Sequence, residues 1–131
     1  MNFGSLNLDY VYGVDHFVQP GETLAAISRD VKHGGKGLNQ SIALVRAGAD
    51  TAHAGCVGQG GESLLAILRE NGVDTSCLLA VQEMQGHTVI QVNREGENCI
   101  LLYGGSNRCV TEKQIRDTMA RFAPGDWLVL Q

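Results

Sequence analysis

The sequence predicts one α/β domain that has a mainly parallel, doubly wound sheet and a separate small sheet or β-lid. Strand patterns alternate with helical patterns along the 131 residues, which is typical of right-handed βαβ crossovers. A β-hairpin pattern interrupts this alternation and predicts the smaller sheet. The last residues form another apolar strand pattern, and no element follows that would cover it. We therefore expect a domain truncated in mid-sheet.

The first half of the chain predicts two strands, a glycine-rich loop and a helix. Residues 1–14 carry the pattern of one buried strand, and residues 22–32 show the partial alternation of an exposed strand. Gly34, Gly35 and Gly37 end that strand. A helix follows, because apolar residues recur on one face at helical spacing, namely Leu38, Ile42, Val45 and Ala49.

The second half continues the alternation and then departs from it. A strand at 51–57, a helix at 62–71 and a strand within 73–81 extend the βαβ pattern. Residues 87–93 and 99–103 are β-rich runs joined by a polar connection that contains glycine. This arrangement predicts a hairpin.

The last two predicted elements are a helix and a strand. Thr111 and Gln114 have the spacing of a capping box, which predicts that a helix begins there and ends before Pro124. Residues 126–131 are an apolar run, typical of a strand buried on both faces.

The composition favours a globular protein and excludes several partners. Apolar residues make up 44% of the chain and the formal charge is −4. An acidic chain without clustered Lys and Arg does not fit a nucleic-acid partner. No apolar stretch approaches the roughly 20 residues that span a bilayer, and the N-terminus has no signal-peptide pattern. We expect a cytoplasmic protein with no membrane partner.

The loop from Gly34 to Asn39 is the densest functional signal. Glycines let the backbone approach a ligand closely, and the unpaired N–H groups at the start of a helix suit oxygen-rich ligands. Lys36 adds a positively charged donor. The sequence is not a Walker A loop, because Lys36 is followed by Gly37 and not by Ser or Thr. The alternative is a tight strand-to-helix turn without a ligand.

Asp9 is a second candidate, near the end of the first strand and two residues after Asn7. Ligands of open α/β sheets bind at the carboxyl ends of strands, where a carboxylate can accept hydrogen bonds from vicinal hydroxyls. A turn-capping aspartate is the alternative. The histidines have no partner at metal-ligand spacing, so we expect no metal site; they are His16, His33, His53 and His87.

Several short motifs occur in order along the chain, namely Asn7-Leu8-Asp9, Pro20-Gly21-Glu22-Thr23, Gly34-Gly35-Lys36-Gly37-Leu38-Asn39-Gln40, Gly55-Cys56-Val57-Gly58, Val92-Asn93-Arg94-Glu95-Gly96-Glu97-Asn98 and Gly104-Gly105-Ser106-Asn107. Together they resemble the N-terminal portion of the ribokinase-like (PfkB) carbohydrate kinases, and the last two resemble the ribokinase branch. The resemblance covers essentially all residues. Independent motifs in one order make a chance match a poor explanation.

The resemblance implies a fold, an activity and a set of binding residues. The fold is the ribokinase-like α/β domain, and the activity is ATP-dependent phosphoryl transfer to a primary hydroxyl of a sugar, with ribose the best candidate. Segments matching residues 22–33 and 84–103 form a β-lid that closes over the sugar and often serves as a homodimer contact. The residues that match the family's sugar ligands are Asn7, Asp9, Gly35, Lys36, Gly37 and Asn39.

The departures from the family pattern concern catalysis. The family's catalytic base is an Asp in a Gly-Ala-Gly-Asp type motif, which does not occur here, so we expect the base beyond Gln131. ATP and Mg²⁺ would then be needed by the complete enzyme and would bind outside this chain. We expect residues 1–131 alone to be inactive, and poorly soluble or oligomeric through the uncovered sheet edge. The alternative is a non-catalytic module for ligand sensing or self-association.

Overall fold

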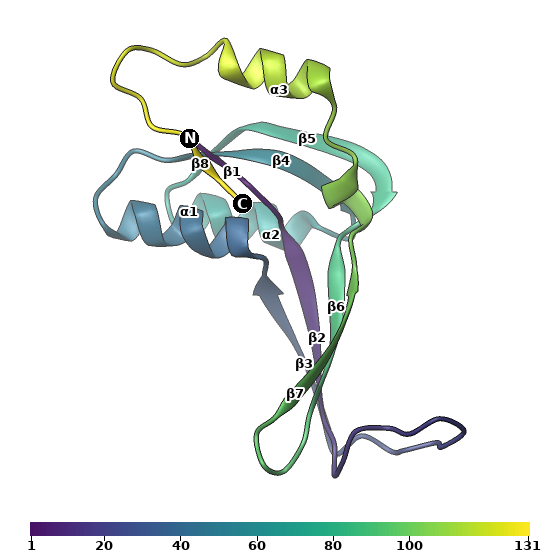
Figure 1. Cartoon of the computed structure of the whole chain (residues 1–131). Coiled ribbons are helices and arrows are strands. Elements are labelled where there is room, and N and C mark those ends of the chain that lie inside the picture. Colours follow the sequence, from purple (N-terminus) through teal and green to yellow (C-terminus); the bar gives the residue numbers. More distant parts are fainter.

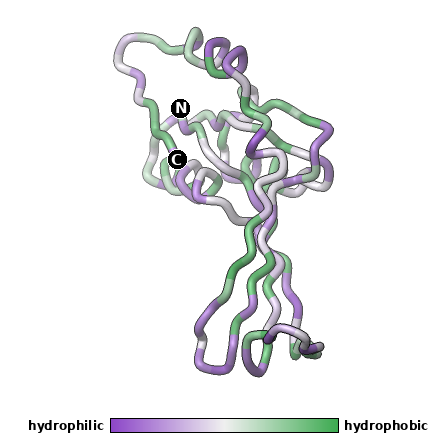
Figure 2. The backbone as a smooth tube through the Cα atoms, turned by 45° about the vertical axis from the view of Figure 1, so that its right-hand side comes forward, coloured by the Kyte–Doolittle hydropathy of each residue, from purple (hydrophilic) through white to green (hydrophobic).

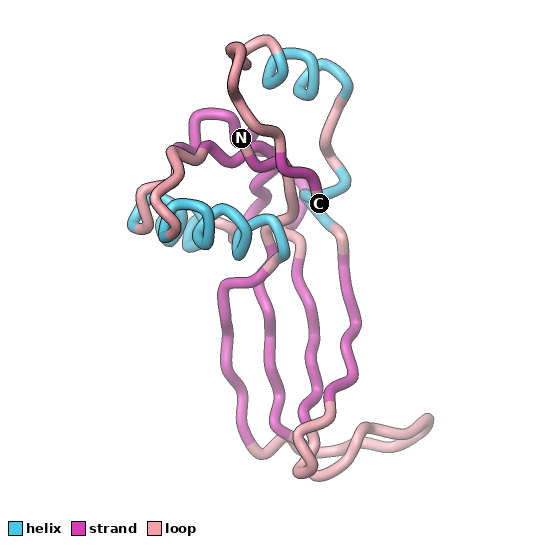
Figure 3. Tube along the Cα trace, turned by 60° about the vertical axis from the view of Figure 1, so that its left-hand side comes forward, coloured by secondary structure: helices cyan, strands magenta, loops and turns pink.

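The computed structural model describes all residues from 1 to 131 and contains two four-stranded sheets. The first sheet is entirely parallel, and its strands, in spatial order, are β5 (Asp74–Met84), β4 (Ala52–Gln59), β1 (Asn2–Phe3) and β8 (Val129–Leu130). The second sheet extends away from the first (Figures 1 and 3), and its order is β3 (Ser28–Gly34), β2 (Asn7–Gly13), β6 (His87–Val92) and β7 (Asn98–Tyr103). The predicted α/β class is confirmed.

Helices cover both faces of the first sheet, as a doubly wound fold requires. Figure 1 shows α1 (Lys36–Arg46) and α2 (Glu62–Glu70) on one face, and α3 (Glu112–Met119) on the other. A short 3₁₀ helix, η1 (Gly105–Arg108), connects β7 to α3. None of these helices has the length and apolar character needed to cross a lipid bilayer.

The main core packs α1 and α2 against the beginning of β2 and against the residue that precedes β5. Its buried members are Leu6, Leu8, Leu38, Leu64, Leu68 and Val73. Ile42 and Val45 pack against this cluster, which confirms the predicted apolar face of the first helix for Leu38, Ile42 and Val45. Ala49, the fourth residue of that face, is exposed and lies beyond the end of the helix. Gly48 and Gly72 have φ values of +90° and +81° directly after the two helices, a backbone conformation that glycine adopts without a steric penalty.

The hairpin prediction is confirmed, and the hairpin belongs to a larger sheet than the pattern indicated. β6 and β7 pair antiparallel, and β6 also pairs parallel with β2. The predicted exposed strand at 22–32 begins only at Ser28, because residues 22–27 lie in the loop that reaches the far end of this sheet. β3 then pairs with β2 up to Gly34.

The prediction of one strand over residues 1–14 is wrong. β1 ends at Phe3, and β2 begins at Asn7 in the other sheet. A Cβ placed on Gly4 would lie 2.7 Å from the Cα of Gly37, so the start of α1 presses directly on the backbone at this point. The chain therefore turns out of the first sheet between the two strands.

The prediction that residues 126–131 form a strand buried on both faces is also wrong. Only Val129 and Leu130 are in β8, which pairs with β1 at the edge of the sheet. Trp127 is 84% exposed and Leu130 is 68% exposed. An apolar run predicts a buried strand only where other elements pack on it, and none of the described residues covers these side chains.

A buried hydrogen-bonded chain joins α1 to the first sheet. Asn2 Nδ2 donates to the Gly37 carbonyl at 2.7 Å and to Ser41 Oγ at 2.9 Å, and Ser41 Oγ lies 2.7 Å from His53 Nδ1. His53 Nε2 lies 3.1 Å from the Gly4 carbonyl, which can only accept. His53 must therefore carry its proton on Nε2 and accept at Nδ1 from the Ser41 hydroxyl. Burial lowers the pKa of His53 to about 4.

We predict that His53 makes the protein acid-sensitive between about pH 6.5 and pH 4. In the unfolded chain His53 has an ordinary pKa near 6.5 and is protonated below that pH. In the folded chain His53 stays neutral until about pH 4. Stability is therefore complete above pH 6.5, and roughly 3 kcal/mol is lost by pH 4. Urea unfolding at several pH values, on wild type and on His53→Leu, measures this slope.

The variant should be less stable at pH 7, because Ser41 loses its partner, and its stability should change less with pH over this range. His33→Gln is the matched control at an exposed histidine, and it should keep the wild-type slope. If the free energy of unfolding of His53→Leu changed with pH as steeply as that of wild type, the prediction would be wrong.

Candidate functional site

Residues 4–6, which join β1 to β2 and are called the kink below, form the centre of the candidate site. Their backbone groups make hydrogen bonds with residues outside these two strands. Ser5 N donates to Gln131 Oε1 at 3.2 Å, and the Ser5 carbonyl accepts from the Leu38 N–H at 3.1 Å. The Leu6 carbonyl accepts from Gln85 Nε2 at 2.6 Å. The segment therefore leaves the sheet, and these backbone groups still have hydrogen-bond partners.

The glycine loop packs against this kink so closely that no side chain fits. Gly35 has a φ of +98°, and a Cβ on it would lie 2.6 Å from the Ser5 carbonyl oxygen. A Cβ on Gly37 would lie 2.5 Å from Ser5 N. Gly37 N also donates to Gln131 Oε1 at 3.0 Å. The glycines are therefore required for the approach of α1 to the kink.

Asn7 and Asp9 lie at the start of β2, on the same face of the second sheet because they are two residues apart. Thr88 on β6 pairs with Asp9, and its hydroxyl donates to Asp9 Oδ1 at 2.7 Å. A Cβ on Gly34 would lie 2.0 Å from Asp9 Oδ2, so the carboxylate fills the space above that glycine. The structure brings Asn7, Asp9 and the glycine loop together.

Lys36 and Asn39 are on the first turns of α1, and both are exposed. Neither side chain makes a hydrogen bond or an ion pair within the chain. Asn39 borders a groove of about 630 Å³ that also involves His33 and Arg46. Lys36 therefore remains free to act as a donor at the beginning of the helix, and Asn39 lies one helical turn after Gly35.

The face that carries Asp9 becomes apolar farther along the second sheet. Val11 pairs with Ile90, and Ile90 pairs with Ile100, so these three side chains lie in one row across β2, β6 and β7. Figure 2 shows hydrophobic stretches along these strands. A ligand at Asp9 would therefore meet polar groups near the kink and an apolar surface beyond them.

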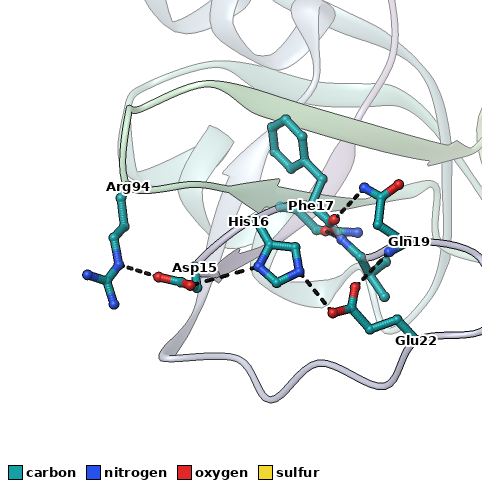
Figure 4. Close-up of polar contacts among 8 residues, drawn as sticks. Asp15, His16, Phe17, Gln19, Glu22 and Arg94 are labelled. Atoms are coloured by element: carbon teal, nitrogen blue, oxygen red, sulfur yellow. Dashed lines mark hydrogen bonds and ion pairs between the residues drawn. The ribbon is translucent and has the colours of Figure 1, made fainter.

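The charged cluster at the far end of the second sheet is a separate feature (Figure 4). His16 Nε2 and Glu22 Oε1 are 2.9 Å apart, and Asp15 pairs with Arg94 of the β6–β7 connection. The hydrogen bond with Glu22 raises the pKa of His16 above its ordinary value. These groups tie two loops together, and they lie at the opposite end of β2 from Asp9.

Sequence reasoning missed Thr88 and Asn107 as parts of the site. Thr88 stands in an ordinary strand pattern, and only the register of β2 and β6 places it beside Asp9. Asn107 belongs to a motif used for the family resemblance, but its contact with Asn7 joins residues 100 positions apart. No local signal in the sequence reports such contacts.

The chemistry of the site suits a ligand rich in hydroxyl groups. Asp9 accepts hydrogen bonds, while Lys36 donates them. The expectation of unpaired N–H groups at the start of this helix is wrong for Gly37 and Leu38, which donate to Gln131 Oε1 and to the Ser5 carbonyl. The structure contains no group of three or more His, Cys, Asp and Glu side chains arranged to hold a metal ion. The described residues thus offer binding groups for a polyol and no cluster for a cation.

A family model described as pfkB family carbohydrate kinase matches residues 1–131. Among curated proteins, the ribokinase of Haemophilus influenzae is 38% identical over 131 residues, which are 98% of this chain and 43% of that protein. The ribokinase of Staphylococcus aureus is 35% identical with the same coverage. The chain thus spans 43% of the length of these relatives.

Solved structures show the same fold. The ribokinase of Cryptococcus neoformans in complex with ADP superimposes with a TM-score of 0.83 and 32% identity, over 99% of this chain and 40% of that chain. The ribokinase of Arabidopsis thaliana complexed with ribose and ATP gives a TM-score of 0.71 and 29% identity, over 81% of this chain and 36% of that chain. The resemblance predicted from the motifs is confirmed.

We predict that Gly34→Ala displaces the Asp9 carboxylate. The new methyl group would overlap Asp9 Oδ2, so the carboxylate must move and give up its hydrogen bond with Thr88. The expected cost is about 1 to 3 kcal/mol in the free energy of unfolding, measured by urea denaturation. In an Asp9→Ala background the same substitution should cost much less, and equal costs in both backgrounds would contradict this geometry.

Proposed function

Because the chain belongs to the pfkB family of carbohydrate kinases, we propose that it is the sugar-binding part of an ATP-dependent kinase that phosphorylates a primary hydroxyl of a sugar. Ribose is the proposed substrate, since the similar curated proteins are named ribokinases. We further propose that residues 1–131 form one part of a single domain, with the second sheet as its lid. Phosphoryl transfer from ATP also implies a cytoplasmic location.

The observation that carries this proposal is the convergence of Asn7, Asp9 and the glycine loop at the kink. Asp9 accepts hydrogen bonds from sugar hydroxyls, and the Lys36 side chain donates to sugar oxygens. Gly35 and Gly37 let the start of α1 lie directly against the backbone that leads into Asn7, which brings Lys36 close to this part of β2. Asn7 and Asn39 supply further amide groups.

The second sheet would exclude water from the sugar site. Its strands extend from the kink, and the row of Val11, Ile90 and Ile100 follows Asp9 on the same face. Closure of this face over a bound sugar would remove water, which competes with the sugar hydroxyl as phosphoryl acceptor. The role of residues 1–131 in the reaction is therefore to bind, orient and shield the acceptor.

We assign the catalytic base, ATP and Mg²⁺ to residues other than these. No Gly-Ala-Gly-Asp motif is present between Met1 and Gln131. The described residues also provide no acidic cluster for Mg²⁺ and no Walker A loop for a triphosphate. Residues 1–131 alone are expected to hold at most part of the sugar site and not to turn over ATP.

We predict that Asp9→Ala weakens ribose binding roughly 10- to 150-fold in the full gene product, because a hydrogen bond to a charged group is lost. Isothermal titration with ribose measures the affinity, and phosphorylation of a panel of pentoses and hexoses with ATP and Mg²⁺ tests the activity. Asp50→Ala, at an exposed loop carboxylate, is the matched control and should bind ribose like wild type.

Two results would overturn the proposal. If the full gene product phosphorylates no sugar of the panel, the kinase assignment fails and a non-catalytic module becomes the better reading. If it phosphorylates ribose but Asp9→Ala binds ribose normally, the kinase assignment stands and Asp9 is only a structural residue.

We also propose that the second sheet mediates a homodimer. β7 is an edge strand, and four successive side chains of it are large and exposed: Ile100 by 54%, Leu101 by 72%, Leu102 by 61% and Tyr103 by 46%. An apolar edge strand with unpaired backbone groups on its outer side favours pairing with a second copy. A second copy of the chain suits this surface, because its own β7 supplies both unpaired backbone groups and exposed apolar side chains.

We predict that Leu101→Lys shifts the protein toward monomer, because a buried charge at the pairing edge is costly. Sedimentation velocity over a range of concentrations measures the shift. Met119→Lys on α3 is the control, since that side chain is also exposed, by 41%, and lies on another element. A wild type that is monomeric at every concentration would refute the homodimer and leave the kinase proposal untouched.

A further inference from the structure

The side-chain amide of Asn107 forms hydrogen bonds with the backbone of Leu6, as the backbone of a neighbouring strand would. Its Oδ1 accepts from the Leu6 N–H at 2.9 Å, and its Nδ2 donates to the Leu6 carbonyl at 3.0 Å. The same Nδ2 also donates to Asn7 Oδ1 at 2.7 Å. Both protons of the Asn107 amide are thus used, and η1 delivers this side chain to the beginning of β2.

These contacts fix the orientation of the Asn107 carboxamide. If it were rotated by 180°, its NH₂ group would face the Leu6 N–H, and its oxygen would face the Leu6 carbonyl and the Asn7 oxygen. Three hydrogen bonds would become three repulsive contacts. The orientation of Asn7 follows, because its oxygen must face the donor on Asn107.

Asn7 consequently directs its NH₂ group away from Asn107. No residue of the chain accepts a hydrogen bond from Asn7 Nδ2, although the residue is only 9% exposed. Asp9 stands two residues along the same face, and its Oδ1 already accepts from Thr88. The strand thus presents one amide donor and one carboxylate acceptor side by side, which matches two neighbouring hydroxyl groups.

Gly86 keeps this contact closely packed. A Cβ on Gly86 would lie 2.1 Å from Asn107 Nδ2 and 2.9 Å from Asn7 Oδ1. The backbone between β5 and β6 therefore packs directly against the Asn7–Asn107 pair.

We propose that Asn107 is a positioning residue, which locks the Asn7 carboxamide with its NH₂ group toward the sugar and so sets the donor–acceptor order of the site. The inference rests on the proposed function, because it takes Asn7 as a sugar ligand. Asn107 itself does not touch the sugar. It acts through Asn7, and its two hydrogen bonds to Leu6 hold it in place to do so.

The test is Asn107→Asp in the full gene product. The carboxylate has nearly the same shape and still accepts from the Leu6 N–H, but it can donate neither to the Leu6 carbonyl nor to Asn7. The Asn7 amide should then turn its NH₂ group toward the carboxylate and offer its oxygen to the sugar. Ribose affinity, measured by isothermal titration, should fall roughly 10-fold or more.

A double-mutant cycle separates positioning from general destabilisation. In an Asn7→Ala background, Asn107→Asp should change ribose affinity by less than about 2-fold, because the group that it orients is gone. Gln114→Glu is the matched control. It makes the same amide-to-acid change at a buried side chain that donates to the Gly55 carbonyl at 2.6 Å, and it should lower stability without changing ribose affinity.

A measurement without sugar tests the same inference. The side-chain NH₂ signals of Asn7 in an NMR spectrum should shift in Asn107→Asp and stay in place in Gln114→Glu. Unshifted Asn7 signals, or an equal loss of ribose affinity in both backgrounds of the cycle, would overturn the positioning role. A wild type that binds no ribose would instead overturn the proposed function, while the NMR result would still decide the orientation of Asn7.

Discussion

The kink between β1 and β2 imposes the constraint on which both sheets depend. A strand that leaves one sheet and enters another exposes backbone groups that no ladder can pair, and each buried group left unpaired costs about 1 to 3 kcal/mol. In this chain the kink is paired by His53 at Gly4, by Gln131 at Ser5, and by Gln85 and Asn107 at Leu6. Groups from distant parts of the sequence thus make this short segment possible.

The same kink creates the candidate site. It places Asn7 and Asp9 at the base of the second sheet, and it allows α1 to begin directly against the backbone because Gly35 and Gly37 have no side chains. Hydrogen bonds that serve stability also serve orientation, since Asn107 pairs with Leu6 and Asn7 at once. Fold and binding chemistry are therefore inseparable at this point, and a substitution here affects both.

The second sheet joins this site to two further properties of the protein. Its Asp9 face is polar at the kink and apolar beyond it, as a cover over a sugar requires, and its β7 edge carries exposed Leu101 and its neighbours. Ile100 belongs to both surfaces, so closure and self-association would share part of one sheet. If the proposed function is correct, shielding of the acceptor and assembly would both depend on this one sheet.

The sequence by itself determined the elements whose signals are local. Apolar spacing identified α1, glycine positions marked its end, and the polar connection between β6 and β7 identified the hairpin, because periodicity and turn chemistry act over a few residues. The motifs also led to Asn7 and Asp9. Only the tertiary structure decided that residues 1–14 split between two sheets, and that Asn107 donates a hydrogen bond to Asn7. These features depend on contacts between residues far apart in the chain, which no local pattern encodes.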